Sequence, residues 1–244
     1  RYGLDLSRVV YRDAPEDQIV LVYVHAETGE RVFSAVGSWG RSVLRAEELD
    51  RDYITSADYL HLDGFHFDAV LQAAQWMHEA GKTVVLDGSK TRGPVRGHMR
   101  TLVEHTDVLI SGSGFVQGLT GRADIWEACA AALDFGPRIV VQTEGAEGSY
   151  TVTAEERFHT PAFTCEVVDT TGAGDVFHGA YIVGLAHGWN PRQIAQFSTA
   201  VSALKCSKLG GRAGIPTFDE TLAFLRERGI EIRDWASLQK TGPV

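Results

Sequence analysis

Short apolar segments alternate with longer amphipathic segments along most of the chain, from about Ser56 onward. The apolar segments have the length and the β-branched residues of strands, and apolar residues between them recur at helical spacing. Connections through helices place successive strands parallel and cover the sheet. The alternation therefore predicts an α/β fold with a parallel sheet. The predicted strands are residues 59–62, 83–86, 108–110 and 139–143; one helix is capped by Asp68 and ended by Gly81, and another spans residues 124–133.

Two hairpins are predicted beside this alternation. The first pairs residues 19–25 with 31–36 around a turn at Gly29 and can stand apart from the main core. The second pairs residues 149–152 with 157–159 and is followed by a strand near residues 166–168. Two helices then close the chain. One begins within residues 172–175 and ends before Gly188; the other has Asn190 as N-cap, Pro191 at its first position and Gln193 at N3.

Composition excludes several classes of function. With 244 residues, 44% of them hydrophobic, the chain can bury a full core, and its apolar runs are too short to span a bilayer. A net charge of −9 disfavours sequence-independent binding to nucleic acid or to anionic membranes. Cys129, Cys165 and Cys206 are widely spaced and odd in number, which favours free thiols in a reducing cytoplasm. The chain begins at Arg1 without a signal-peptide pattern, and a truncated N-terminus is expected.

The segment from Asp169 to Ala180, DTTGAGDVFHGA, joins a predicted strand to a predicted helix. Its small residues let the backbone approach a ligand, and the unpaired N–H groups of the first helical turn suit a phosphoryl group. Asp175 could then accept the proton of a substrate hydroxyl. The alternative is that Asp175 only favours the helix N-terminus and that the glycines only relieve crowding.

This segment resembles the C-terminal signature of the ribokinase-like (PfkB) family, which includes ribokinase, adenosine kinase and 2-keto-3-deoxygluconate kinase. The order of the other elements is also similar. The resemblance implies an αβα sandwich with a β lid and phosphoryl transfer from MgATP to an alcohol, often with activation by K⁺. It implies Asp175 as the base and Gly172, Ala173 and Gly174 as the anion hole. Residues 1–45 then form a partial lid and its connection, residues 46–244 form the kinase core, and lids that pair imply a homodimer.

The resemblance also implies the nucleotide and cation sites. Asp169, the Thr171 carbonyl and the carbonyls of Lys205, Lys208 and Gly210 match a monovalent-cation shell, with Gly214 in place of a serine ligand. Thr143, Gly145 and Gly148 match a loop facing the ATP phosphates, although a turn between two strands would look the same. Ser198 and Gly210 match nucleotide-binding positions, and a core serine is an equally good interpretation of Ser198.

The candidate acceptor residues lie near the ends of two predicted strands. Asp63, Lys90 and Arg92 could contact the substrate, as could His61 and His66, but solvated or capping roles are the more common explanation for such residues. Two magnesium-organising positions of the family, an asparagine and a glutamate, are occupied by Gly112 and Phe115. The loop from Leu204 to Pro216 is similar to that of sulfofructose kinase and related sugar kinases, which favours a hexose or ketose derivative, neutral or anionic, over a nucleoside.

Three functions compete on these observations. The first is an ATP-dependent phosphotransferase that phosphorylates a hydroxymethyl group of a sugar, with ATP and Mg²⁺ and K⁺ as cofactors. The second is a non-catalytic nucleotide- or sugar-binding relative with the same fold. The third, a dinucleotide-dependent oxidoreductase, is disfavoured because the glycine-rich turn lies late in the chain and places an acid where a pyrophosphate would be repelled.

Overall fold

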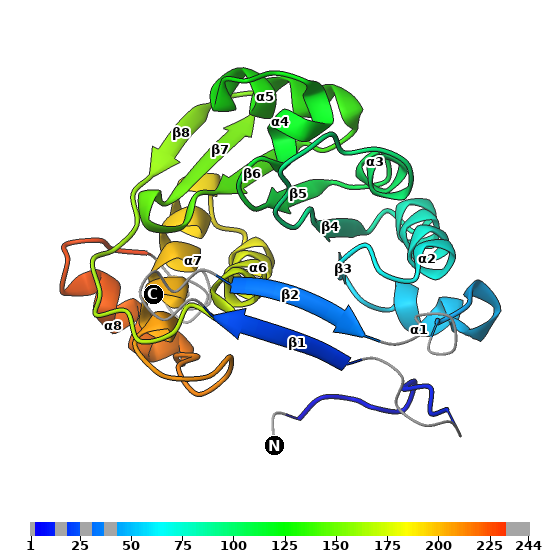
Figure 1. Cartoon of the computed structure of the whole chain (residues 1–244), viewed down its shortest axis with the longest axis horizontal. Helices are drawn as coiled ribbons and strands as arrows, with labels where there is room; N and C mark the ends of the chain where they lie inside the picture. The colour runs from blue at the N-terminus through cyan, green and yellow to red at the C-terminus, as the bar shows by residue number, and fades with distance from the viewer. Residues whose placement is uncertain (1–2, 13–18, 25–30, 37–42, 233–244) are drawn as a thin grey trace, which may run out of the picture.

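A six-stranded sheet forms the centre of the molecule (Figure 1). The computed structural model describes residues 3–12, 19–24, 31–36 and 43–232. The strands follow one another across the sheet in chain order; β3 to β6 are parallel, and β7 and β8 are antiparallel additions at one edge. The strands are β3 (Tyr59–Leu62), β4 (Thr83–Asp87), β5 (Val108–Ser111), β6 (Ile139–Thr143), β7 (Ser149–Thr153) and β8 (Arg157–Thr160).

Helices cover both faces of the sheet. Because alternate residues of a strand point to opposite faces, Val84 and Leu86 of β4 pack into one core and Val85 into the other. The first core lies under α2 (Phe67–Glu79), α3 (His98–Val103), α4 (Phe115–Thr120) and α5 (Ile125–Ala132). The second lies under α6 (Ala173–Ala186), α7 (Pro191–Cys206) and α8 (Phe218–Arg226). The short helix α1 (Arg51–Thr55) precedes the sheet. The predicted αβα sandwich is confirmed.

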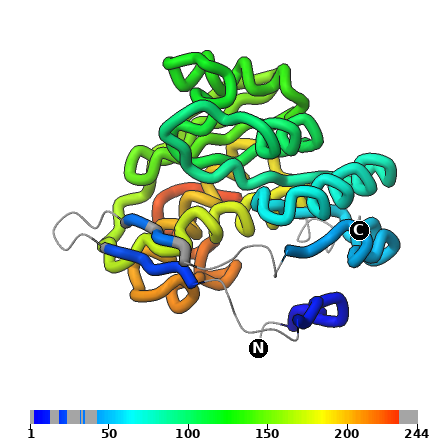
Figure 2. The backbone as a smooth tube through the Cα atoms, turned by 45° about the vertical axis from the view of Figure 1, so that its right-hand side comes forward, coloured from blue at the N-terminus to red at the C-terminus, as the bar shows by residue number. Residues whose placement is uncertain are grey.

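A separate antiparallel ribbon precedes this core. It consists of β1 (Ile19–Val24) and β2 (Arg31–Val36), which pair with each other and with no other strand of the described residues. Figures 1 and 2 both show the ribbon standing clear of the six-stranded sheet. The predicted hairpin is therefore confirmed, while its turn at Gly29 lies outside the described residues.

Most predicted helix ends agree with the structure. Asn190 caps α7, and its side chain and that of Gln193 form a reciprocal capping box around Pro191. Helix α2 begins earlier than predicted, because His66 adopts a left-handed conformation (φ 57°) and serves as the N-cap in place of Asp68. We also predicted a strand near residues 166–168, and this is wrong. The N–H groups of Val168 and Asp169 donate to the carbonyl of Cys206, so they do not pair with a strand.

The described residues bear on two expectations, one about membrane-spanning segments and one about the cysteines. No helix among them combines the length and the apolar character that crossing a bilayer requires. The three cysteines carry free thiols, as predicted.

Candidate active site

The start of α6 is the centre of the candidate site. Gly172, the N-cap, has φ +79°, a conformation that favours glycine, and a Cβ there would lie 3.0 Å from the carbonyl oxygen of Gly211. The N–H of Ala173 donates to the Thr170 carbonyl and that of Val176 to the Gly172 carbonyl. Asp175 lies in the first turn of the helix with its side chain exposed. The structure thus brings an accessible carboxylate beside the predicted anion hole.

Asp169 ties this turn to the loop after α7. One carboxylate oxygen accepts the N–H of Thr171, the other accepts the N–H of Gly210, and both distances are 2.8 Å. These hydrogen bonds from backbone amides favour the ionised form and lower the pKa of Asp169 to about 2. Asp169 therefore remains an anion at any physiological pH and holds two loops together.

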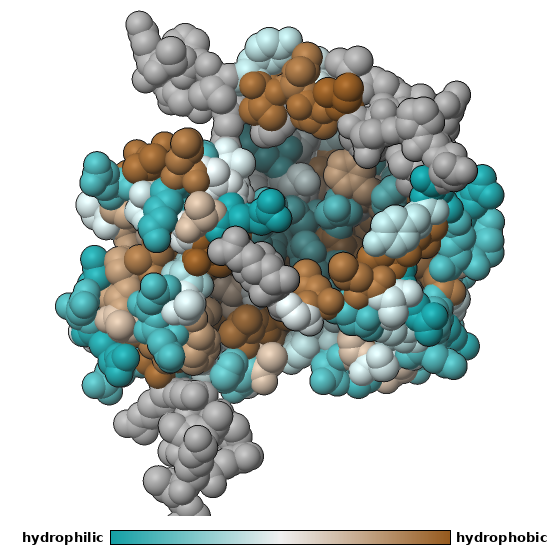
Figure 3. Space-filling view, turned by 90° about the horizontal axis from the view of Figure 1, so that it is seen from below, coloured by the Kyte–Doolittle hydropathy of each residue, from teal (hydrophilic) through white to brown (hydrophobic). Residues whose placement is uncertain are grey.

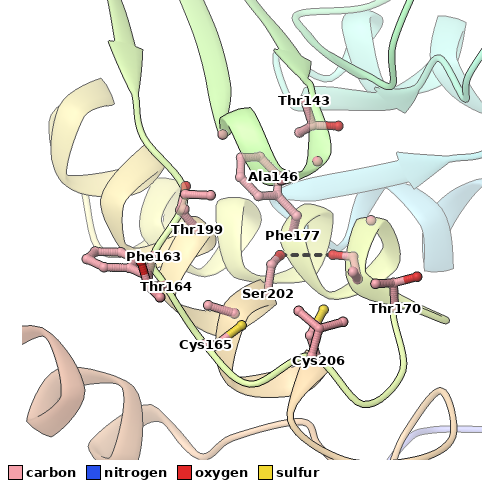
Figure 4. Close-up of a pocket in the computed structure, with 17 residues that line it drawn as sticks. Thr143, Ala146, Phe163, Thr164, Cys165, Thr170, Phe177, Thr199, Ser202 and Cys206 are labelled. Atoms are coloured by element: carbon pink, nitrogen blue, oxygen red, sulfur yellow. Dashed lines mark hydrogen bonds between the residues drawn. The ribbon is translucent and has the colours of Figure 1, made fainter. Parts of the chain in front are cut away.

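A pocket of about 450 Å³ opens next to the anion hole. Figure 4 shows its walls, which come from the loop after β6, the segment after β8, the start of α6 and the middle of α7. Among the predicted nucleotide residues, Thr143, Gly145 and Gly148 line it, as do Ala173 and Gly174. Phe163 and Phe177 contribute aromatic rings that could contact a nucleobase or ribose. From the side that Figure 3 shows, the surface is hollowed, with both hydrophilic and hydrophobic residues around the recess.

Two predicted nucleotide residues lie elsewhere. Ser198 is fully buried, and its hydroxyl donates to the carbonyl of Ile194, so it fits the core interpretation. Thr199 and Ser202, on the same helix, line the pocket instead. The Ser202 hydroxyl donates to the Ala173 carbonyl at 2.9 Å and so supports the start of α6 (Figure 4). Gly210 acts through its N–H bond to Asp169.

The two unusual positions of the magnesium motif have a packing explanation. A Cβ at Gly112 would lie 3.1 Å from the Cβ of Lys90 and 3.3 Å from its Cα, because the loop after β4 packs directly on this residue. Phe115 is only 2% exposed and belongs to the core. Neither position has a side chain that can bind magnesium. The residues present do not fit the family's asparagine–glutamate arrangement, and among the described residues no three His, Cys, Asp or Glu side chains group as a metal site.

The strand ends on the other side of α6 carry a polar cluster that we did not predict. His178, one turn after Asp175, is 5% exposed, and its Nε2 lies 3.6 Å from Oδ1 of Asp87. Its Nδ1 lies 3.4 Å from Nε2 of His61, which is exposed at the end of β3. The sequence signal was a lone histidine three residues after Asp175 in a largely apolar helix, which does not by itself indicate its partners.

The remaining acceptor candidates are spread around this cluster. Asp63 is exposed, and Oδ1 accepts the N–H of Phe65. Lys90 and Arg92 are exposed on the loop after β4. The His66 ring accepts the N–H of Leu44, which ties α2 to the preceding segment. His66 therefore serves the fold, while Asp63, Lys90 and Arg92 stay candidates. Lys205 and Lys208 lie at the other end of the site, the first buried and the second exposed.

His178 should make the stability of the protein depend on pH. Burial is the largest effect and lowers its pKa below the usual 6.5; Asp87 and Asp175 oppose this shift, and His61 adds to it. The unfolded chain therefore binds a proton that the folded chain does not, so stability is full above about pH 6.5 and falls as the pH drops below it. We expect His178→Asn to remove up to ~1.4 kcal/mol per pH unit from the slope of unfolding free energy against pH.

The measurement is urea unfolding at several pH values on both sides of neutrality. His98→Asn, at an exposed histidine of α3, is the matched control and should leave the slope unchanged. An equal slope in wild type and His178→Asn would contradict the assignment.

The fold is the ribokinase-like α/β fold, which solved ribokinase structures share. The chain belongs to the pfkB family of carbohydrate kinases, whose family model matches residues 1–218. The predicted family and fold are thereby confirmed.

Named relatives support the same grouping. The ATP-dependent ribose-1-phosphate kinase of Halopiger xanaduensis is 30% identical over 93% of this chain and 73% of its own length. The 2-dehydro-3-deoxygluconokinase of Bacillus subtilis is 28% identical over 91% of this chain and 74% of its own. Among solved structures, the ribokinase of Thermotoga maritima has a TM-score of 0.70 and 27% identity, and the match covers 85% of this chain and 69% of that one.

Proposed function

We propose that the protein transfers the γ-phosphoryl group of ATP to a hydroxymethyl group of a sugar or sugar derivative. The observation that carries this proposal is the exposed carboxylate of Asp175 in the first turn of α6, beside the Gly172–Gly174 amides and a pocket large enough for a nucleotide. Asp175 accepts the proton of the acceptor hydroxyl as its oxygen attacks phosphorus. The bond from phosphorus to the bridging oxygen breaks, and ADP leaves. The amides at the helix start stabilise charge on the transferring group.

The pocket takes the nucleotide, with Thr143, Gly145 and Gly148 near the phosphates and Phe163, Thr199 and Ser202 bordering the rest. Mg²⁺ would reach the site with ATP and neutralise phosphate charge. Since positions 112 and 115 do not fit as ligand positions, no step of this mechanism depends on a protein-held metal. The family resemblance also implies K⁺ beside Asp169, and the ammonium group of Lys205 lies there.

The acceptor lies on the other side of Asp175, where β3 and β4 end. Asp63, Lys90, Arg92 and His61 are exposed there and can donate to or accept from sugar hydroxyls. An anionic sugar derivative suits the two cations. Two of the three relatives named above support this class, because ribose 1-phosphate and 2-dehydro-3-deoxygluconate are anions.

A non-catalytic nucleotide-binding relative is the second candidate, favoured by Gly112 and Phe115. ATP consumption by the purified protein distinguishes the two, measured with Mg²⁺ against sugars, sugar phosphates, sugar acids and nucleosides. Turnover on one acceptor supports the kinase and identifies its substrate. ATP binding without turnover on any acceptor would favour the second candidate.

Residues 1–45 act in this proposal as a partial lid and its connection, and residues 46–244 as the core. The three free thiols suit a reducing cytoplasm. The lid also suits a second copy of the chain as its partner. Side chains on both faces of β1 are exposed and apolar, from 46% for Leu21 to 59% for Tyr23, and an uncovered strand edge favours pairing.

Charged substitutions on the ribbon test the homodimer. Leu21 and Val22 are neighbours in β1, so their side chains point to opposite faces. One of the two variants, Leu21→Lys or Val22→Lys, places a lysine on the face that contacts the partner. We expect this variant to raise the dissociation constant of the dimer by about tenfold or more, because it buries an unpaired charge. The other variant, on the opposite face, is its control. Light scattering after size exclusion measures the mass. A monomeric wild type at micromolar concentration would contradict the dimer.

A further inference from the structure

Lys205 is an unusual residue for the interior of a protein. It lies in the last turn of α7, its exposed fraction is 0%, and it is among the largest fully buried side chains of the described residues. Its Nζ donates to the backbone carbonyl of Asp169 at 2.8 Å. Burying an ammonium group is costly unless oxygen atoms or opposite charges surround it, so a lysine in this place needs a reason.

The groups around the ammonium of Lys205 are of the kind that bind a cation. The carboxylate of Asp169 belongs to the residue whose carbonyl binds Nζ, and it is held ionised by two amides. The C-terminal end of α7 presents backbone carbonyls and the negative end of the helix dipole. Anion, carbonyls and dipole all favour a positive charge at this point.

The family resemblance places a K⁺ ion among the same groups, but the residues present do not fit that shell. The side-chain ligand of that shell is the Asp169 carboxylate, and both of its oxygens already accept backbone N–H groups, from Thr171 and Gly210. The Lys205 carbonyl is covered by Gly214, where a Cβ would lie only 2.2 Å from that oxygen. A serine at position 214 could therefore not be accommodated without moving the loop, and glycine supplies no side-chain ligand.

We infer that the ammonium group of Lys205 is a built-in monovalent cation that replaces K⁺ in organising the anion hole. This inference rests on the proposed function, since it assigns a positioning role within that site. Lys205 acts by fixing the position of Asp169, the first residue of the segment that leads to Gly172. The carbonyl of Asp169 is held by Nζ, its N–H by the Cys206 carbonyl and its carboxylate by the Gly210 N–H.

The first test uses the unaltered protein. If Lys205 supplies the charge, replacing K⁺ by tetramethylammonium at equal ionic strength should change turnover by less than about twofold, a negligible difference in barrier height. The midpoint of thermal unfolding should likewise show no K⁺-specific rise. A saturable K⁺-specific rise in turnover or in the unfolding midpoint would overturn the inference, because a protein stabilised by K⁺ must bind it.

The second test removes the ammonium. In Lys205→Ala we expect turnover in tetramethylammonium to fall by at least about tenfold, as for a misplaced catalytic group, and K⁺ or ammonium ions to restore part of it. The unfolding midpoint of this variant should rise with K⁺ concentration, which the wild type does not show. Lys82→Ala removes a lysine ammonium that pairs with Asp58 outside the candidate site; it is the matched control and should behave as wild type in every salt.

The outcomes separate this inference from the proposed function. If no acceptor is phosphorylated, the unfolding midpoints in the two salts still test the role of Lys205. A folded Lys205→Ala variant that loses turnover and does not respond to K⁺ or ammonium in either readout would overturn the inference and leave Lys205 a packing residue. If the variant does not fold, the wild-type measurements decide alone.

Discussion

Asp175→Asn should lower the turnover of the phosphorylated acceptor by about 10²–10⁴-fold, the usual contribution of a positioned general base. The amide has nearly the same shape as the carboxylate but cannot take the proton of the acceptor hydroxyl. ATP binding should change little, because the pocket is lined by other residues and Asp175 lies in the exposed first turn of α6. The measurement is kcat from steady-state ATP consumption together with the dissociation constant of ATP from calorimetry.

A matched control exists at the start of another helix. Asp219 is also an exposed aspartate in a first helical turn, that of α8, outside the candidate site. Asp219→Asn removes the same charge near a helix N-terminus and should leave kcat unchanged. Wild-type turnover in Asp175→Asn would exclude Asp175 as the base. Equal losses in the two variants would point to a general effect of charge or stability.

The architecture could be predicted because its signals are local. Each strand of the sheet is a short apolar run, and the start of α7 is specified by the neighbouring residues Asn190, Pro191 and Gln193. The strand near residues 166–168 was mispredicted because the hydrogen-bond partner of this segment is distant in the sequence. Apolar residues suggested a strand there, but the backbone amides bond to Cys206, about 40 positions later in the chain.

Local signals also predicted part of the lining of the pocket. The turn from Gly172 to Asp175 carries its own signature, and the structure places Thr143, Gly145 and Gly148 around the adjacent pocket. His178 and Lys205 were different, because their meaning depends on partners from distant segments. Helical spacing places Lys205 in the last turn of α7, but only the three-dimensional structure shows that its ammonium reaches Asp169.

Gly112 illustrates how packing explains an apparent loss of function. In sequence it stands where the family has a polar residue, which suggests a weakened metal site. In the structure the loop after β4 lies against it, so a larger residue would displace the backbone of Lys90. Glycine at position 112 therefore leaves room for the loop after β4. Lys90 of that loop is exposed and is itself an acceptor candidate.

Gly148→Ala is expected to destabilise the protein by about 3 kcal/mol or more, since a strained backbone conformation and a backbone clash act together. Gly148 has φ +98° and ψ −136°, a combination that side chains disfavour. An added Cβ would lie 2.0 Å from the Thr160 carbonyl oxygen and 2.7 Å from the Ala162 nitrogen. Both are backbone atoms, one in the last residue of β8 and one two residues after it, so neither can rotate away.

The effect should extend from stability to nucleotide binding. The Gly148 carbonyl accepts the N–H of Glu144 at 2.7 Å, which closes the loop between β6 and β7, and displacement of Gly148 opens that loop beside the pocket. Gly145→Ala is the control: Gly145 lies in the same loop with φ +57°, but a Cβ there meets nothing within 4 Å. It should lose only about 1 kcal/mol, the conformational cost. Urea unfolding and ATP titration measure both quantities; equal losses at the two glycines would refute the steric explanation.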